Sequence, residues 1–193
     1  ADLHFSPTDQ SKHNLLQENK KDESIVVTGN TAIDALSTTV TDDYESEIIK
    51  RHEGKRIVLL TAHRRENIGK SMENIFKAVR QIVEEHEDVV VVYPMHKNPK
   101  VREIANQILS NHDRIELIEP LEVIDFHNFA ANSHLILTDS GGVQEEAPSL
   151  GKPVLVLRDT TERPEGVEAG TLKLVGVEEE NIYNETKALL NDQ

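Results

Sequence analysis

The sequence predicts an α/β fold in which a Rossmann-like parallel sheet is covered by helices on both faces. Two observations support this prediction. From about Ile57 onward, apolar runs rich in β-branched residues alternate with stretches of helical periodicity, which is the order of repeated strand–helix units. The apolar runs are also continuous, as is typical of strands that are buried on both faces of a parallel sheet.

The first expected strand covers residues 56–60, where four apolar residues follow Arg56. The next helix has one apolar face, spaced as in an amphipathic helix that packs on a sheet: Met72, Ile75, Phe76, Val79, Ile82 and Val83. Residues 89–93 form the next expected strand. Pro99, which is tolerated in a first turn, then starts a second helix. Its expected buried face consists of Val101, Ile104, Ala105, Ile108 and Leu109.

The second half of the chain continues this alternation to its end. The expected elements are, in order, a strand at 115–118, a helix near 123–132, a strand at 135–137, a helix through Val143, Ala147 and Leu150, strands at 153–157 and 171–175, and a helix near 181–190. We found no internal repeat and no low-complexity segment in this pattern. The regular order therefore supports one sheet for this part of the chain.

The turn Thr138-Asp139-Ser140-Gly141-Gly142 is the most informative segment of the sequence. Ser140 is expected to cap the following helix, and the two glycines leave the first N–H groups of that helix uncovered. An anion, most simply a phosphate, fits at such a helix start. Gly151 is expected to end the helix. The next strand leads into Arg158 and Arg163, so two arginines are expected beside the same helix start.

The first forty residues follow a different pattern. Residues 2–8 begin within what is expected to be the end of a strand, residues 25–30 form a second short strand, and residues 37–47 are rich in Thr, Asp and Ser. We therefore expect residues 1–40 to be the tail of a preceding domain plus a connector, and residues 41–193 to be the Rossmann-like domain. The alternative is a complete small domain with a ragged start.

Composition limits the kind of ligand. The 193 residues are 37% hydrophobic, which is enough for one sizeable core. A formal net charge of -14 disfavours nucleic acid and anionic membranes as partners, so any phosphate site must be local. Cysteine is absent, which excludes disulfides and thiolate metal sites and fits a cytoplasmic chain. Because no apolar run is long enough to span a membrane and the first residues do not resemble a signal peptide, we expect a soluble protein.

Polar segments follow five of the expected strands at the point where each strand ends. These segments are residues 61–67, 94–99, 119–121, 140–142 and 158–163. Ligands of open parallel sheets bind in the crevice outside the carboxyl ends of the strands, so we expect the five segments to meet at one edge. Two histidines, several arginines and the glycine-lined helix start would make that crevice an anion site in an acidic protein.

Each of these features also has a simpler structural explanation. Gly141 and Gly142 alone could serve a tight turn, and His96 alone is more typical of a capping or packed histidine. Glu145 and Glu146 are at positions that usually face solvent, although Glu146 lies one turn after Gly142 and could face a ribose hydroxyl. The other histidines have no metal-ligand spacing and are interpreted as structural: His4, His13, His52, His86, His112, His127 and His134.

Four segments together resemble the non-hydrolysing bacterial UDP-N-acetylglucosamine 2-epimerases. They are residues 28–34, 61–67, 94–99 and the long run from 138 to 165, and the resemblance covers nearly the whole chain. The long run is highly specific, because its length and residue order leave little room for chance. The resemblance implies one half of a two-domain, glycosyltransferase-B-like architecture. That half is the carboxy-terminal, UDP-binding one, without most of the first domain and without the family's last helix.

The resemblance also implies roles for residues that bind the nucleotide. Arg163 is expected to bind the diphosphate, while Ser140, Gly141 and Gly142 add hydroxyl and backbone N–H donors. Glu146 is expected to bind the ribose hydroxyls. The implied ligands are UDP and UDP-N-acetylglucosamine, and neither a metal nor a cofactor is implied.

Main-chain groups near Leu121 and Phe126 are expected around the uracil, although many relatives have glutamine where this chain has Leu121. His63 matches a family histidine that is implicated in catalysis. We expect it to be the donor that stabilises or protonates the departing diphosphate. His96 is expected to line the same crevice without an assigned role.

The reaction implied by the resemblance interconverts UDP-N-acetylglucosamine and UDP-N-acetylmannosamine, through elimination of UDP and its re-addition, in cell-envelope polysaccharide biosynthesis. In the family, the carboxylates that move the C2 proton belong to the other domain. We therefore expect this chain alone to bind UDP weakly and not to epimerise, and the full-length protein to be a cytoplasmic homodimer.

Two alternatives stay open from the sequence. The chain could be a stand-alone module that binds nucleotide sugars, with its catalytic partner on another chain. The complete enzyme could also be a hydrolysing epimerase or a glycosyltransferase. The continuous run from 138 to 165 favours the epimerase, since the other branches show only parts of it.

Overall fold

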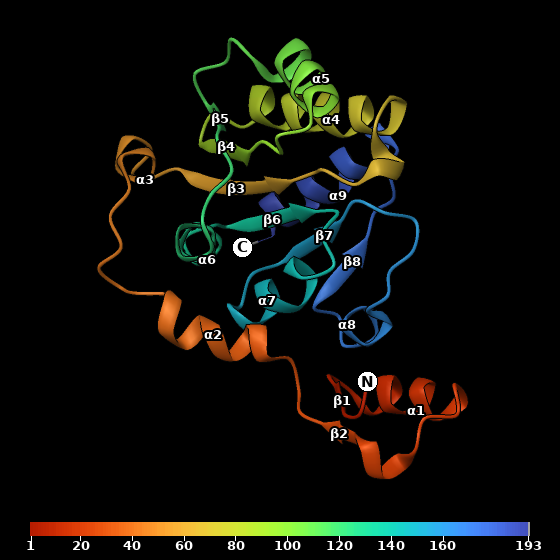
Figure 1. The fold of residues 1–193 in the computed structure, drawn as a ribbon. Coiled ribbons are helices and arrows are strands. Elements are labelled where there is room, and N and C mark those ends of the chain that lie inside the picture. Colours follow the sequence, from red (N-terminus) through yellow and green to blue (C-terminus); the bar gives the residue numbers. More distant parts are fainter. Residues whose placement is uncertain (193) are drawn as a thin grey trace. The chain divides into compact units, whose positions relative to one another are not determined.

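The computed structural model describes residues 1–192, which divide into two compact units, residues 1–38 and a second unit that begins at Thr39. The first unit is a small βαβ motif in which β1 (His4–Ser6) pairs in parallel with β2 (Ile25–Val27) (Figure 1). Between them lie α1 (Asp9–Gln17) and the 3-10 turn η1 (Asp22–Ser24). The next helix, α2 (Thr31–Thr39), runs into the boundary between the units.

The second unit is built on a six-stranded parallel sheet. Its strands are β3 (Arg56–Thr61), β4 (Val89–Pro94), β5 (Ile115–Ile118), β6 (Leu135–Thr138), β7 (Val154–Val156) and β8 (Leu172–Leu174). They are arranged in the order β5-β4-β3-β6-β7-β8, and every neighbouring pair is parallel. The direction of winding reverses between β3 and β6, which makes that pair the topological switch point of the sheet.

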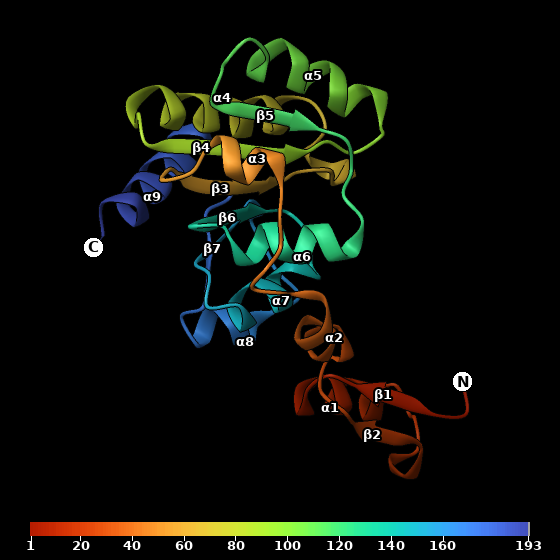
Figure 2. The same cartoon turned by 90° about the vertical axis from the view of Figure 1, so that its left-hand side faces the viewer.

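Helices cover both faces of this sheet, as the sequence predicts (Figures 1 and 2). One face carries α4 (Lys70–Glu85), α5 (Pro99–Leu109) and α9 (Glu179–Asn191), and the other carries α6 (Val123–Ala131) and α7 (Val143–Ser149). Two short helices, α3 (Glu47–Arg51) and α8 (Pro164–Glu168), and the 3-10 turn η2 (Arg65–Asn67) complete the unit. Within residues 1–192, no helix is long and apolar enough to cross a membrane.

Alternate residues of the central strands point into separate hydrophobic cores. Val58 and Leu60 of β3 belong to the core under α4, α5 and α9, whereas Ile57 and Leu59 belong to the core under α6 and α7. This alternation follows from the two-residue period of a strand, and it explains why the run is apolar at every position. The six residues expected on the apolar face of α4 are all buried: Met72, Ile75, Phe76, Val79, Ile82 and Val83.

The predicted strands of the second unit are confirmed, with ends that shift by a few residues, but four helices were not predicted. These are α1, α2, α3 and α8. Helix α1 buries no residue, and α3 and α8 have only five residues each, so none of the three has a repeating apolar face. In α5, Ile104 and Ile108 are only partly buried, whereas Val101, Ala105 and Leu109 are fully buried as expected.

Candidate functional site

The carboxyl ends of β3 and β6 lie side by side at the switch point, where the sequence predicts a crevice. The last residues of the two strands, Thr61 and Thr138, lie opposite each other, and their hydroxyl oxygens are 2.6 Å apart. Beyond this pair the chains diverge into residues 62–69 and 139–142. Parallel sheets bind ligands at such a divergence, because the two loops leave space between them.

Asp139 ties the two loops together. Its side chain is fully buried, and Oδ2 accepts hydrogen bonds from the backbone N–H groups of His63 (2.9 Å) and Arg64 (2.8 Å) and from the side-chain amide of Asn67 (3.1 Å). Its own N–H donates to the carbonyl of Thr61 over 3.0 Å. Charge-assisted hydrogen bonds are stronger than neutral ones, so this carboxylate fixes the loop after β3 against the end of β6.

The imidazole of His63 lies beside the Asp139 carboxylate. Its Nδ1 lies 3.4 Å from Oδ1 of Asp139, and 42% of its side chain is exposed. The ring stacks on that of His96, with centroids 5.6 Å apart and an angle of 15° between the planes. Nδ1 of His96 accepts a hydrogen bond from the N–H of Asn98 (3.1 Å), so a neutral His96 carries its proton on Nε2. The structure therefore brings the two expected histidines together.

Arg64 is the cation beside the glycines. Its Nε donates to the carbonyl of Asp139 over 2.9 Å, and a Cβ atom on Gly141 would lie 3.8 Å from its Nη2. Glu66 and Glu162 lie 3.6 and 3.8 Å from its Nη1. The sequence places Arg64 in a polar segment without a role of its own, and the fold sets its guanidinium at the turn that was expected to receive an anion.

Ser140 does not cap α7, so this prediction is wrong. The N-cap is Gly142, two residues later, and it makes no side-chain cap hydrogen bond. The N–H of Ser140 instead donates to the hydroxyl of Thr138 (2.9 Å), and its carbonyl accepts from the side-chain amide of Gln144 (3.1 Å). Gly141 and Gly142 separate Ser140 from Val143, the first residue of the helix. Ser140 is therefore not at the N-cap position.

Helix α7 ends as predicted. Gly151 follows the helix with a φ of 69°, a left-handed conformation that glycine adopts without strain, and its N–H donates to the carbonyl of Pro148 over 2.9 Å.

Arg163 reaches the start of α7, whereas Arg158 pairs elsewhere. The Arg163 guanidinium forms an ion pair with Glu145 in the first turn of α7. The Arg158 side chain is buried and binds Glu162 through two hydrogen bonds of 2.6 and 2.9 Å. The hydrogen bonds from Arg158 lower the pKa of Glu162 to about 2. The expectation that both arginines lie at the same helix start holds for Arg163 alone, because Glu162 holds Arg158.

Glu146 lies close to the second glycine. A Cβ atom on Gly142 would be 3.8 Å from its Oε1, and its Oε2 is 3.7 Å from Nε2 of His127. Burial raises the pKa of Glu146 above its ordinary value, and His127 partly opposes that shift. Nδ1 of His127 lies 2.7 Å from the hydroxyl oxygen of Thr39. His127, interpreted from the sequence as structural, is therefore a buried neighbour of the carboxylate that was expected to bind ribose.

Leu121 and Phe126 lie at the start of α6. Leu121 precedes the helix and, like Phe126, is partly buried against the core under α6 and α7. The N–H of Phe126 donates to the carbonyl of Glu122 over 2.9 Å, so it is already used within the helix. A main-chain contact to a base is therefore expected in the loop before α6 and not at the N–H of Phe126.

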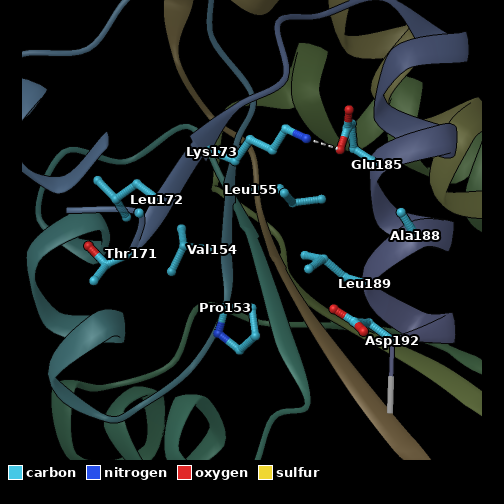
Figure 3. A pocket seen from close by; sticks show the side chains of 11 residues that line it. Pro153, Val154, Leu155, Thr171, Leu172, Lys173, Glu185, Ala188, Leu189 and Asp192 are labelled. Atoms are coloured by element: carbon cyan, nitrogen blue, oxygen red, sulfur yellow. Dashed lines mark hydrogen bonds and ion pairs between the residues drawn. The ribbon is translucent and has the colours of Figure 1, made fainter. Parts of the chain in front are cut away.

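A cavity of about 250 Å³ lies away from this crevice, between α9 and the last two strands (Figure 3). It is lined by Pro153 and Val154 at the start of β7, by Leu172 at the start of β8, and by residues of α9. Lys173 and Glu185 form an ion pair of 2.5 Å beside it. Pro153, Val154 and Leu172 lie at the amino ends of their strands, whereas His63 follows the carboxyl end of β3. The cavity is therefore separate from the candidate site.

The residues that sequence reasoning missed are Asp139, Arg64, Asn67 and His127. For Asp139 the available signal was its position directly after the buried strand β6. For the others the partners lie far away in the chain, as with Asn67 and Asp139, which are 72 residues apart. In the part of the chain that the structure describes, no group of three His, Cys, Asp or Glu side chains is placed to hold a metal.

The comparisons with known proteins give one consistent result. The family model for UDP-N-acetylglucosamine 2-epimerase matches residues 1–193. The UDP-N-acetylglucosamine 2-epimerase of Bacillus subtilis is 70% identical over 192 residues, which is 100% of this chain and 50% of that protein. The chain therefore spans about half the length of the curated relatives that it matches.

Two solved structures extend the comparison to the fold. The Staphylococcus aureus MnaA–UDP co-structure matches with a TM-score of 0.95 and 64% identity, over 100% of this chain and 53% of that one. The UDP-GlcNAc 2-epimerase from Neisseria meningitidis, bound to UDP-GlcNAc, matches with a TM-score of 0.90 and 45% identity, over 98% of this chain and 53% of that one. The likeness covers the chain from end to end.

Proposed function

Since the chain belongs to the UDP-N-acetylglucosamine 2-epimerase family, we propose that it is the UDP-binding half of a non-hydrolysing UDP-N-acetylglucosamine 2-epimerase. The match of the family model to residues 1–193 carries this proposal. The geometry of the switch point supports it, because the crevice gathers His63, Arg64 and the Gly141–Gly142 turn in a protein whose net charge is -14.

In this proposal the diphosphate lies between the Gly-Gly turn and Arg163. Ser140 supplies a hydroxyl, and Gly141 and Gly142, which have no side chains of their own, supply backbone N–H groups. Arg163 takes the phosphate as a partner in addition to, or in place of, Glu145. Arg64, whose guanidinium lies beside Gly141, adds a second local positive charge.

The nucleoside extends from the diphosphate toward α6. Glu146 accepts hydrogen bonds from the ribose hydroxyls, which is consistent with its position one turn after the glycines. The uracil lies against Leu121 and Phe126, with its main-chain contacts in the loop that precedes α6.

His63 is the proposed acid for the leaving group. In the elimination step the bond between C1 of the sugar and the diphosphate oxygen breaks, the C2 proton goes to a base, and Nε2 of His63 gives its proton to the departing UDP. Re-addition reverses these transfers after the proton returns to the opposite face of C2. The base belongs to the half of the enzyme outside this chain, so we propose that the chain alone binds UDP and does not epimerise.

We further propose that the complete protein has two domains, of which residues 1–40 contribute the end of the first together with a connector, and that it works as a cytoplasmic homodimer. The support for two domains is that the chain aligns with about half of each relative. The cysteine-free sequence is consistent with a reducing compartment.

The test is calorimetry of UDP with the chain, together with product analysis of the complete enzyme. We expect the chain to bind UDP and to leave UDP-N-acetylglucosamine unchanged, and the complete enzyme to form UDP-N-acetylmannosamine. Release of free N-acetylmannosamine would identify a hydrolysing enzyme instead. Absence of UDP binding would contradict the proposed site. Turnover by the chain alone would contradict the proposal that the base belongs to the other half of the enzyme.

A further inference from the structure

One oxygen of the buried Asp139 carboxylate has no hydrogen-bond donor among the described residues. Oδ2 accepts three hydrogen bonds, but Oδ1 accepts none, although the side chain is 0% exposed. A buried acceptor without a donor is costly, more so when it is charged. The group that faces Oδ1 is Nδ1 of His63, at a distance of 3.4 Å.

We propose that Asp139 is a positioning residue for His63, whose Oδ1 accepts the Nδ1 hydrogen and thereby holds the imidazole in one tautomer, with Nε2 facing the crevice. The catalytic consequence rests on the proposed function of His63. The tautomer itself rests only on the geometry of the two side chains. A small rotation of the ring brings the 3.4 Å separation into hydrogen-bond range.

The surroundings of His63 support this arrangement. Oδ2 of the same carboxylate accepts the backbone N–H of His63 over 2.9 Å, so both the main chain and the ring of this histidine are placed relative to Asp139. The ring of His96 stacks on His63 with an angle of 15° between the planes, which restricts tilting of the imidazole. The main chain, the Nδ1 edge and one ring face of His63 therefore each have a neighbour in the fold.

The proposed contact decides which nitrogen of His63 exchanges protons. With Nδ1–H directed at a carboxylate, Nε2 is the atom that accepts and returns a proton.

The Asp139→Asn variant is expected to have the opposite His63 tautomer. Three donors surround the position of Oδ2, so the amide oxygen of the new side chain will occupy it and the NH₂ group will face His63. Nδ1 must then accept a hydrogen bond, which moves the proton of the neutral ring to Nε2. The variant is thus expected to invert the tautomer of His63, whereas a purely structural role predicts no such inversion.

The test is long-range ¹H–¹⁵N correlation spectroscopy of the imidazoles in the ¹⁵N-labelled chain, at about pH 8, where an ordinary histidine is neutral. His63→Gln assigns the signal. We expect the Nδ1–H tautomer in the wild-type chain and the Nε2–H tautomer in D139N. Asp159→Asn is the matched control, because Asp159 is an exposed carboxylate after β7 and should leave the tautomer unchanged.

An Nε2–H tautomer in the wild-type chain, or an unchanged tautomer in D139N, overturns the proposal. If D139N does not fold by circular dichroism, the wild-type spectrum alone still decides. UDP calorimetry on the same samples separates the two proposals, since loss of UDP binding removes the proposed function while the tautomer result stands. In the complete enzyme, D139N is expected to lower kcat about 100-fold or more and to change UDP affinity about threefold or less.

Discussion

Arg163, at the start of α8, pairs with Glu145 in the first turn of α7. The pair joins two segments that leave neighbouring strands of the sheet, β6 and β7. It also places the Arg163 guanidinium beside the first turn of the helix that follows the Gly-Gly turn. The long run from 138 to 165 therefore contains both partners of an ion pair beside the proposed diphosphate site.

Arg163→Ala is expected to weaken UDP binding to this chain about 10- to 100-fold, because a hydrogen bond to a charged group contributes about 1.5–3 kcal/mol. Calorimetry with UDP measures the change. Arg51→Ala is the control, since Arg51 is a largely exposed arginine whose partner is Glu116 of β5. Equal affinity of the wild type and R163A would take Arg163 out of the site.

His63→Gln is expected to reduce kcat of the complete enzyme about 10²- to 10⁴-fold, the usual contribution of a positioned acid or base. UDP affinity should change far less, because the ring is proposed to act on the leaving group. Steady-state kinetics and calorimetry together measure both effects. His134→Gln, an exposed histidine at the amino end of β6, should leave both unchanged. An effect confined to KM would contradict a catalytic role.

Glu146 is expected to make UDP binding depend on pH. Burial raises its pKa above the ordinary value of 4.5, and ribose hydroxyls donate only to the ionised carboxylate with full strength. UDP affinity should therefore rise as the pH rises through the raised pKa. Glu146→Gln should weaken binding and remove this dependence. Ionisation of UDP itself affects the wild type and E146Q equally, so the difference between their calorimetric pH profiles reports on Glu146 alone. Parallel profiles would contradict the assignment of Glu146 to the ribose hydroxyls.

Glu146→Gln should also stabilise the fold at neutral pH. A carboxyl group with a raised pKa holds its proton more tightly in the folded chain than in the unfolded one. Its favourable contribution is therefore complete below pH 4.5 and is lost as the pH rises through the raised pKa. We expect E146Q to raise the free energy of unfolding at pH 7 relative to the wild type and not to raise it at pH 4. Urea denaturation at the two pH values measures this.

Gly166 is expected to tolerate no side chain. A Cβ atom there would lie 2.5 Å from Cδ1 and 2.9 Å from Cγ of Leu172, a buried residue of β8. Gly166→Ala should lower the free energy of unfolding by about 1–3 kcal/mol and displace α8, including Arg163 at its N-cap. Denaturant titration measures the first effect and UDP calorimetry the second. Glu165→Ala, at the exposed neighbouring position, should change neither.

The sheet could be predicted from the sequence because each strand carries its own signal. Val58, Leu60 and their apolar neighbours are continuous since both faces of β3 are buried, and the face of α4 repeats at the helical period. Helix α8 carries no such signal, because it has five residues and buries none of them. Its position depends on the contact of Gly166 with Leu172, which only the folded chain reveals.

The site could be predicted less completely than the sheet. The five polar segments were expected from the rule that loops at the carboxyl ends of parallel strands meet, and the loops after β3 and β6 do so at the switch point. The partners of individual side chains were not predictable. Arg158 was expected beside Arg163, but Glu162, four residues after it, holds it in place, and Asp139 takes its donors from residues more than seventy positions away.

The three hydrogen bonds to Oδ2 of Asp139 have a consequence for the thermodynamics of ligand capture. A loop that is already ordered loses little conformational entropy when a nucleotide arrives, so more of the interaction energy remains as affinity. Nucleotide binding should then require little rearrangement of the loop after β3. The loss of conformational entropy on binding should come mainly from the ligand and from side chains that change their ionic partner, such as Arg163.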